Sequence, residues 1–72
     1  MERLLFESII TNEERIKQLE NLLERMQAIR YWEVKRIPKG TIIIIEALQM
    51  CAFELGLALT NKGYPVERVY EE

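Results

Sequence analysis

Hydrophobic residues recur every three or four positions through the first thirty residues of this chain. Glu, Lys and Arg dominate the opposite side of a helical projection. The residues of the apolar side are Leu5, Ile9, Ile16, Leu19, Leu23 and Met26. Such a stripe is typical of an amphipathic helix with a heptad-like seam. Thr11-Asn12-Glu13-Glu14 also has the pattern of a capping box, which would start a new helix there. The continuous seam favours one long helix over residues 2–35.

The segment Ile37-Pro38-Lys39-Gly40-Thr41 predicts a turn, because proline disfavours helical backbone at Ile37 and glycine tolerates positive φ. Residues 42–59 are then largely apolar, up to a helix-ending Asn61-Lys62-Gly63. No Gly, Pro, Ser, Asn or Asp lies between Ile45 and Ala47 to end a strand and begin a helix. A single helix over residues 41–62, with Thr41 as its N-cap, is therefore the simpler interpretation.

The same segment supports a second architecture. Four consecutive isoleucines at residues 42–45 have high strand propensity, and they would pair with residues 31–37 around Pro38-Lys39-Gly40. We expect one domain over residues 1–72, an all-α helical hairpin with residues 64–72 as a C-terminal arm. The alternative is an α+β fold with a β-hairpin at 31–45, in which the C-terminal residues supply a short strand.

The expected helix lengths imply an oligomer. At 1.5 Å per residue the first helix would be roughly 50 Å long and the second roughly 30 Å, which leaves residues 4–10 as an apolar overhang. A domain of 72 residues buries only a small core, and its single cysteine cannot form an intrachain disulfide that would stabilise it. We therefore expect a homodimer that forms a four-helix bundle. The expected interface residues are Leu5, Phe6, Ile9, Ile16, Leu19, Leu23, Met26, Leu48, Phe53 and Leu55.

The residue types that are absent restrict the chemistry. The chain has no His, and its twelve acidic residues are all Glu. This excludes a Ser-His-Asp triad, an aspartic dyad and a His-based metal centre. The three glycines stand too far apart for a phosphate-binding loop. We expect a non-enzymatic protein that uses no cofactor and no metal.

Basic residues gather around the predicted turn. Residues 30–41 carry four basic side chains and one acidic, within a chain of net charge −2. Cations beside an aromatic ring suit phosphates and bases. The candidate nucleic-acid-binding residues are Arg30, Trp32, Lys35, Arg36 and Lys39. The alternative is that these cations only favour the C-terminal end of a helix dipole.

These observations favour a homodimeric adaptor or regulator that acts through protein contacts, with a nucleic-acid-binding regulator as the alternative. The N-terminal residues lack the pattern of a signal peptide, and Glu46 and Glu54 oppose membrane insertion of the apolar stretch. We therefore expect a cytoplasmic protein that contacts no membrane. Abundant Glu, Lys, Arg and Ile are typical of thermophile proteins.

Overall fold

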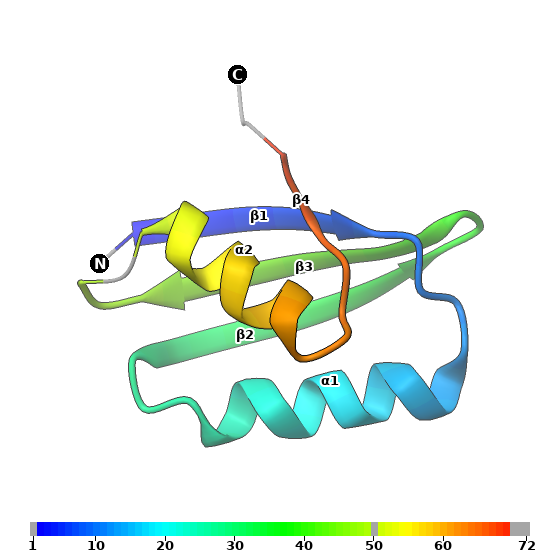
Figure 1. The fold of residues 1–72 in the computed structure, drawn as a ribbon, viewed down its shortest axis with the longest axis horizontal. Helices are drawn as coiled ribbons and strands as arrows, with labels where there is room; N and C mark the ends of the chain where they lie inside the picture. The colour runs from blue at the N-terminus through cyan, green and yellow to red at the C-terminus, as the bar shows by residue number, and fades with distance from the viewer. Residues whose placement is uncertain (1, 50, 70–72) are drawn as a thin grey trace.

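The chain forms a four-stranded antiparallel sheet with both helices packed on one of its faces (Figure 1). The computed structural model describes residues 2–49 and 51–69. Its elements in chain order are β1 (Glu2–Ser8), α1 (Glu13–Arg25), β2 (Ile29–Ile37), β3 (Gly40–Ala47), α2 (Ala52–Asn61) and β4 (Glu67–Val69). The strands are ordered β2-β3-β1-β4, so each helix connects two strands that flank a third. This is the ferredoxin-like topology of two split β-α-β units.

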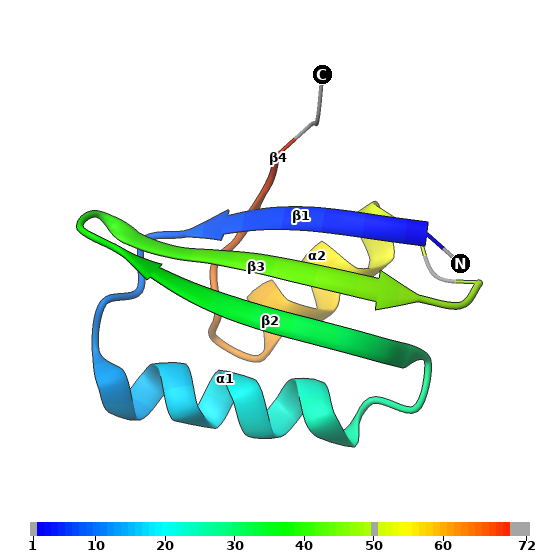
Figure 2. The same cartoon turned by 180° about the vertical axis from the view of Figure 1, so that it is seen from behind.

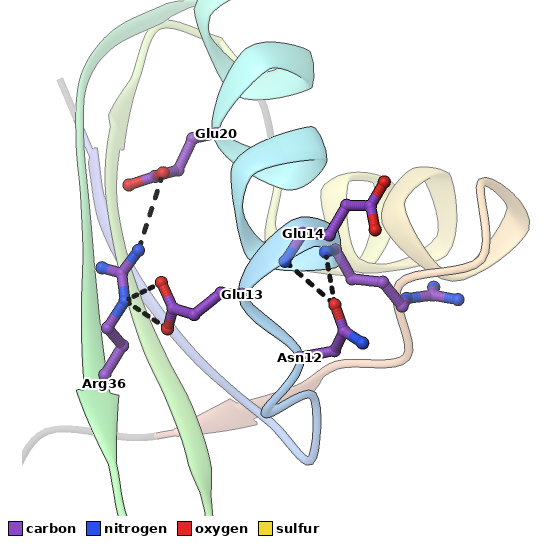
Figure 3. Close-up of polar contacts among 6 residues, drawn as sticks. Asn12, Glu13, Glu14, Glu20 and Arg36 are labelled. Carbon is purple, nitrogen blue, oxygen red and sulfur yellow. Dashed lines mark hydrogen bonds and ion pairs between the residues drawn. The ribbon is translucent and has the colours of Figure 1, made fainter.

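The expected all-α hairpin and its four-helix bundle are therefore wrong, and the α+β alternative is the fold that forms. Residues 2–8 are strand β1, and the first helix is limited to Glu13–Arg25. Asn12 starts it, because its Oδ1 accepts hydrogen bonds from the backbone N–H groups of Glu14 at 2.9 Å and Arg15 at 3.2 Å (Figure 3). The alternative helix start near Thr11 is thus confirmed.

The expected helix over residues 41–62 is also wrong, because it is divided into strand β3 and helix α2. The connection uses none of the usual turn residues. Gln49 adopts a left-handed backbone, with φ of +53°. Cys51 then acts as the N-cap of α2, and its Sγ accepts a hydrogen bond from the backbone N–H of Glu54 at 3.4 Å. Gln49 thus takes the left-handed position that glycine usually occupies, and Cys51 takes the N-cap position that serine or aspartate usually occupies.

Alternation along β1 brings the N-terminal segment into the core. Leu4 and Phe6 pair with Ile45 and Ile43 of β3, and all four side chains are buried beneath the helices. Helix α1 and helix α2 complete this core with Ile16, Leu19, Leu23, Ala52, Leu55 and Leu59. The apolar overhang expected at residues 4–10 does not exist, so the argument that a dimer must cover it is wrong.

The hairpin of β2 and β3 turns at Pro38-Lys39, and β3 returns as a central strand between β2 and β1. The short strand that the α+β alternative placed near the C-terminus is β4, which pairs with β1. Residues 70–72 of the expected C-terminal arm lie outside the described residues. Within residues 2–49 and 51–69, no helix has the length and hydrophobicity needed to cross a bilayer.

Thr41 is a fully buried residue of β3 instead of the expected N-cap, and its Oγ1 has no hydrogen-bond partner among the described residues. We expect Thr41→Val to raise the free energy of unfolding by about 1 kcal/mol, because valine keeps the shape and removes an unpaired buried hydroxyl. The midpoint of thermal denaturation should rise by about 4–8 °C. Thr60→Val, at an exposed position, is the control. A lower midpoint for Thr41→Val would show that this hydroxyl is hydrogen-bonded in solution.

Candidate interaction surfaces

Helix α2 has two apolar sides, and only one of them is used in the core. Ala52, Leu55 and Leu59 face the sheet and are buried. On another side of the same helix, Phe53 is 77% exposed and Leu57 is 50% exposed. These two residues are one turn apart, so they form a continuous apolar strip along the surface. A contiguous exposed apolar strip is a candidate contact surface.

A groove of about 350 Å³ lies beside this strip, between α2 and β4. We call it the α2–β4 groove; it is lined by Phe6, Ala52, Phe53, Gly56, Leu57, Thr60, Val66 and Arg68. Gly56 keeps it open, because a Cβ at this position would lie 3.3 Å from Cε1 of Phe6 and 3.9 Å from Cγ2 of Val66. Among the described residues of the lining, Arg68 alone is charged. The groove is thus apolar, with a cation on its β4 side.

The hollowed surface continues past the end of α2, where Glu7 and Glu67 also line it. A second hollow, of about 360 Å³, shares Thr60 and Val66 with the α2–β4 groove and reaches Ile9. Ile9 follows β1 and is 78% exposed. The two hollows together join Phe53 to Ile9 along one side of the molecule.

The ten predicted interface residues are divided between the core and the surface. Five are buried inside the single chain and are not available to a partner: Phe6, Ile16, Leu19, Leu23 and Leu55. Leu5 and Met26 are half-buried. Ile9, Leu48 and Phe53 remain exposed. Ile9 and Phe53 were among the expected interface residues, and they stay a prediction. Gly56 and Leu57 were not, although their spacing of three and four residues from Phe53 was the available signal.

The face of the sheet opposite the helices is covered by none of the described elements (Figure 2). The strand register places the following side chains on it, which we call the open face: Arg3, Leu5, Glu7, Tyr31, Glu33, Lys35, Ile42, Ile44, Glu46, Glu67 and Val69. Its centre is aliphatic, with Leu5 directly beside Ile44. Ile44 is only 6% exposed although it lies on the face opposite the helices. The charged residues surround this centre.

Polar contacts on the open face involve β2. The Tyr31 hydroxyl donates a hydrogen bond of 2.8 Å to Oε1 of Glu33. This bond stabilises the protonated phenol and raises the pKa of Tyr31 above its ordinary value. Lys35 Nζ lies 3.9 Å from Oε2 of the same Glu33. Glu33 is thus shared by a phenol and an ammonium group.

The candidate nucleic-acid-binding residues do not share one surface. Alternation in β2 sends Trp32 to the helix side, where it packs against the core, and Lys35 to the open face. Arg36 also lies on the helix side, with Nε 2.8 Å from Oε2 of Glu13 and a second contact to Glu20 of α1 at 3.9 Å (Figure 3). The hydrogen bond from Arg36 lowers the pKa of Glu13. Arg30 is exposed near the start of β2, and Lys39 is exposed in the turn between β2 and β3.

The open face also differs from a typical RNA-binding sheet. Four-stranded sheets that bind RNA stack bases on aromatic side chains. The central strands here present aliphatic Leu5, Ile42 and Ile44 instead. Nucleic-acid binding therefore stays a prediction, and these positions give it no stacking platform. Among the described residues, no three side chains of the metal-binding types lie close enough together to hold an ion.

Comparison with known proteins places the chain in no family, because no family model matches it and neither the curated proteins nor the solved structures contain a significant match. A ferredoxin-like topology does not define a function by itself, since many unrelated activities use it. The functional argument therefore depends on the two surfaces described above.

Proposed function

We propose that this protein is a non-enzymatic interaction module, an adaptor or regulator that docks an amphipathic helix of another protein in the α2–β4 groove. The observation that carries the proposal is the exposure of Phe53 and Leu57 beside this groove. Both side chains would lose water-accessible apolar surface against a partner. Burial of a large apolar side chain contributes about 1.5–3 kcal/mol, and aromatic residues often dominate such contacts.

The length of α2 and the apolar lining of the groove support a helical occupant. Helix α2 has ten residues and is therefore about 15 Å long, which matches nearly three turns of a second helix. Helices that dock in grooves insert apolar side chains spaced at three, four and seven residues. The apolar lining of the α2–β4 groove suits such anchors. The cation of this lining, Arg68, favours a partner helix that carries a carboxylate on the side toward β4.

The test is a titration of the ¹⁵N-labelled full chain with a panel of designed 18-residue amphipathic peptides, in acidic and basic versions. Amide shifts should change at the groove residues, and an acidic version should bind several-fold more tightly than its basic counterpart. Phe53→Ser should weaken binding by about tenfold or more, because an exposed aromatic anchor is lost.

Tyr31→Ser is the matched control, since Tyr31 is another exposed aromatic residue but lies on the open face. It should leave peptide affinity unchanged. Two results would exclude the proposed docking site. One is the absence of groove shifts with every peptide of the panel, and the other is equal affinity for the Phe53→Ser variant and the unaltered chain.

A further inference from the structure

We infer that the open face is a self-association surface, on which a second copy of the chain packs sheet against sheet. This inference is independent of helix docking, because α2 lies on the other side of the sheet (Figures 1 and 2). The aliphatic centre of the open face provides an apolar contact, and its charged residues specify the orientation of the copies. Aligned packing of two sheets places the facing layers about 10 Å apart.

The register defines which residues would meet. A two-fold axis parallel to the strands, between β1 and β3, lays β1 of one copy on β3 of the other. Leu5 then faces Ile44 of the second copy, because the two residues are cross-strand neighbours within each chain. The same operation lays β2 on β4, since these are the outer strands of the sheet. The apolar centres of the two copies therefore coincide.

The charges are complementary in this arrangement. Arg3 faces Glu46 of the second copy, because these residues are directly opposed in the register of β1 and β3. Lys35 lies level with Ile42, Glu7 and Glu67 across the four strands, so it faces Glu67 of the second copy. Two-fold symmetry repeats each pair. Arg3 and Lys35 thus both meet carboxylates of the other chain.

The Lys35–Glu67 pair is specific to the dimer. Within one chain these residues belong to opposite outer strands, three strand spacings apart, which is about 14 Å. They cannot form an ion pair in a monomer. Any energetic coupling between them therefore reports contact between two copies.

The size of the open face indicates a weak dimer. Four strands about 4.8 Å apart and seven residues at about 3.3 Å each give a flat area of roughly 400 Å² per copy, below the ~800 Å² of standard interfaces. Glu7 and Glu33 would face the apolar Ile42 and Val69 of the second copy, which also limits affinity. We therefore expect a dissociation constant in the micromolar range or weaker. The dimer would present its two α2–β4 grooves on opposite outer sides.

Sedimentation equilibrium of two charge-reversal variants of the full chain tests the inference. Lys35→Glu places two carboxylates at each pair, and Glu67→Lys places two ammonium groups there. Each variant alone should dimerise about tenfold more weakly than the unaltered chain. An equimolar mixture should recover the original affinity, because the two substituted side chains of the heterodimer pair with each other and the natural Lys35–Glu67 pair remains at the symmetric position. Raised salt should reduce this recovery.

Both substitutions are at exposed positions, so the variants should keep the thermal midpoint of the unaltered chain. Phe53→Ser is the control from the other surface, and it should leave self-association unchanged. A chain that stays monomeric at several hundred micromolar would overturn the inference. So would loss of the dimer in Phe53→Ser without recovery in the mixture, since the second copy would then occupy the α2–β4 groove. Peptide docking should persist in Lys35→Glu, which separates the two proposals.

Discussion

Replacing Gly40 by alanine is expected to destabilise the fold by about 3 kcal/mol or more, because an added Cβ has no space. It would lie 1.9 Å from the carbonyl oxygen of Ser8 and 3.1 Å from Cα of Ile9. Both atoms belong to the backbone, and Ser8 is paired with Thr41 at the end of β1. A flexible side chain could rotate away from this contact, but a paired strand cannot.

Thermal denaturation measures this effect. Because the midpoint shifts by about 4–8 °C per kcal/mol, it should fall by at least about 12 °C. Gly63→Ala is the matched control. Its Cβ would lie 3.5 Å from the guanidinium of Arg15, so only the positive φ of 94° opposes it. A loss of about 1 kcal/mol is expected there. Equal stability of Gly40→Ala and the unaltered chain would contradict the close approach of β3 to the end of β1.

Phe6→Ala is expected to cost about 3–5 kcal/mol of stability, which is the usual effect of removing a buried aromatic ring. Phe6 is 1% exposed and packs between the central strands and α2. The loss should be independent of protein concentration, since Phe6 is buried within one chain. In the helical bundle expected from the sequence it would instead lie at the dimer contact, and its effect would vary with concentration.

Ile9→Ala is the control for this experiment, because Ile9 is three residues away along the chain but 78% exposed. Its free energy of unfolding should change by less than about 0.5 kcal/mol. Urea denaturation of both variants at two protein concentrations gives the comparison. A large effect of Ile9→Ala with a small effect of Phe6→Ala would mean that β1 is shifted by one residue, which reverses its two faces.

Several local features could be predicted from the sequence. The buried side of α1 follows the expected seam at Ile16, Leu19 and Leu23, because this helix lies over the apolar side of the sheet. The turn at Pro38-Lys39 was also expected, and the isoleucines of β3 form the strand of the α+β alternative. These features depend on side-chain periodicity and backbone preferences within a few residues. Such local preferences do not depend on the position of distant segments of the chain.

The type of the first element could not be read from its pattern. Leu4, Leu5 and Phe6 are consecutive, so they fit a helical seam through Leu5 and an alternating strand through Leu4 and Phe6 equally well. Pairing with both β3 and β4 selects the strand. These partners lie about forty and sixty residues away, and no local window contains them. The end of β3 could not be predicted from the sequence either, because Gln49 takes a left-handed backbone that its residue type does not favour.

The candidate surfaces were predictable in part. Phe53 and Ile9 were expected at the interface of a helical bundle; both are exposed in the α+β fold, whereas the bundle itself does not form. The five basic or aromatic residues at 30–39 were expected to act together. Alternation in β2 separates Trp32 and Arg36 from Lys35 instead. A strand places neighbouring residues on opposite faces, whereas the helix end that was expected there would have gathered them.

The sequence by itself determined the restricted chemistry, since a chain without His or Asp lacks the usual triads and His-based metal centres wherever its elements lie. It also determined the buried side of α1, because this side depends on a periodicity within a few helical turns. Only the tertiary structure decided which apolar residues are core and which are surface. That decision depends on strand pairing between distant segments, whose hydrogen bonds and shared burial outweigh the helical tendency of residues 2–10.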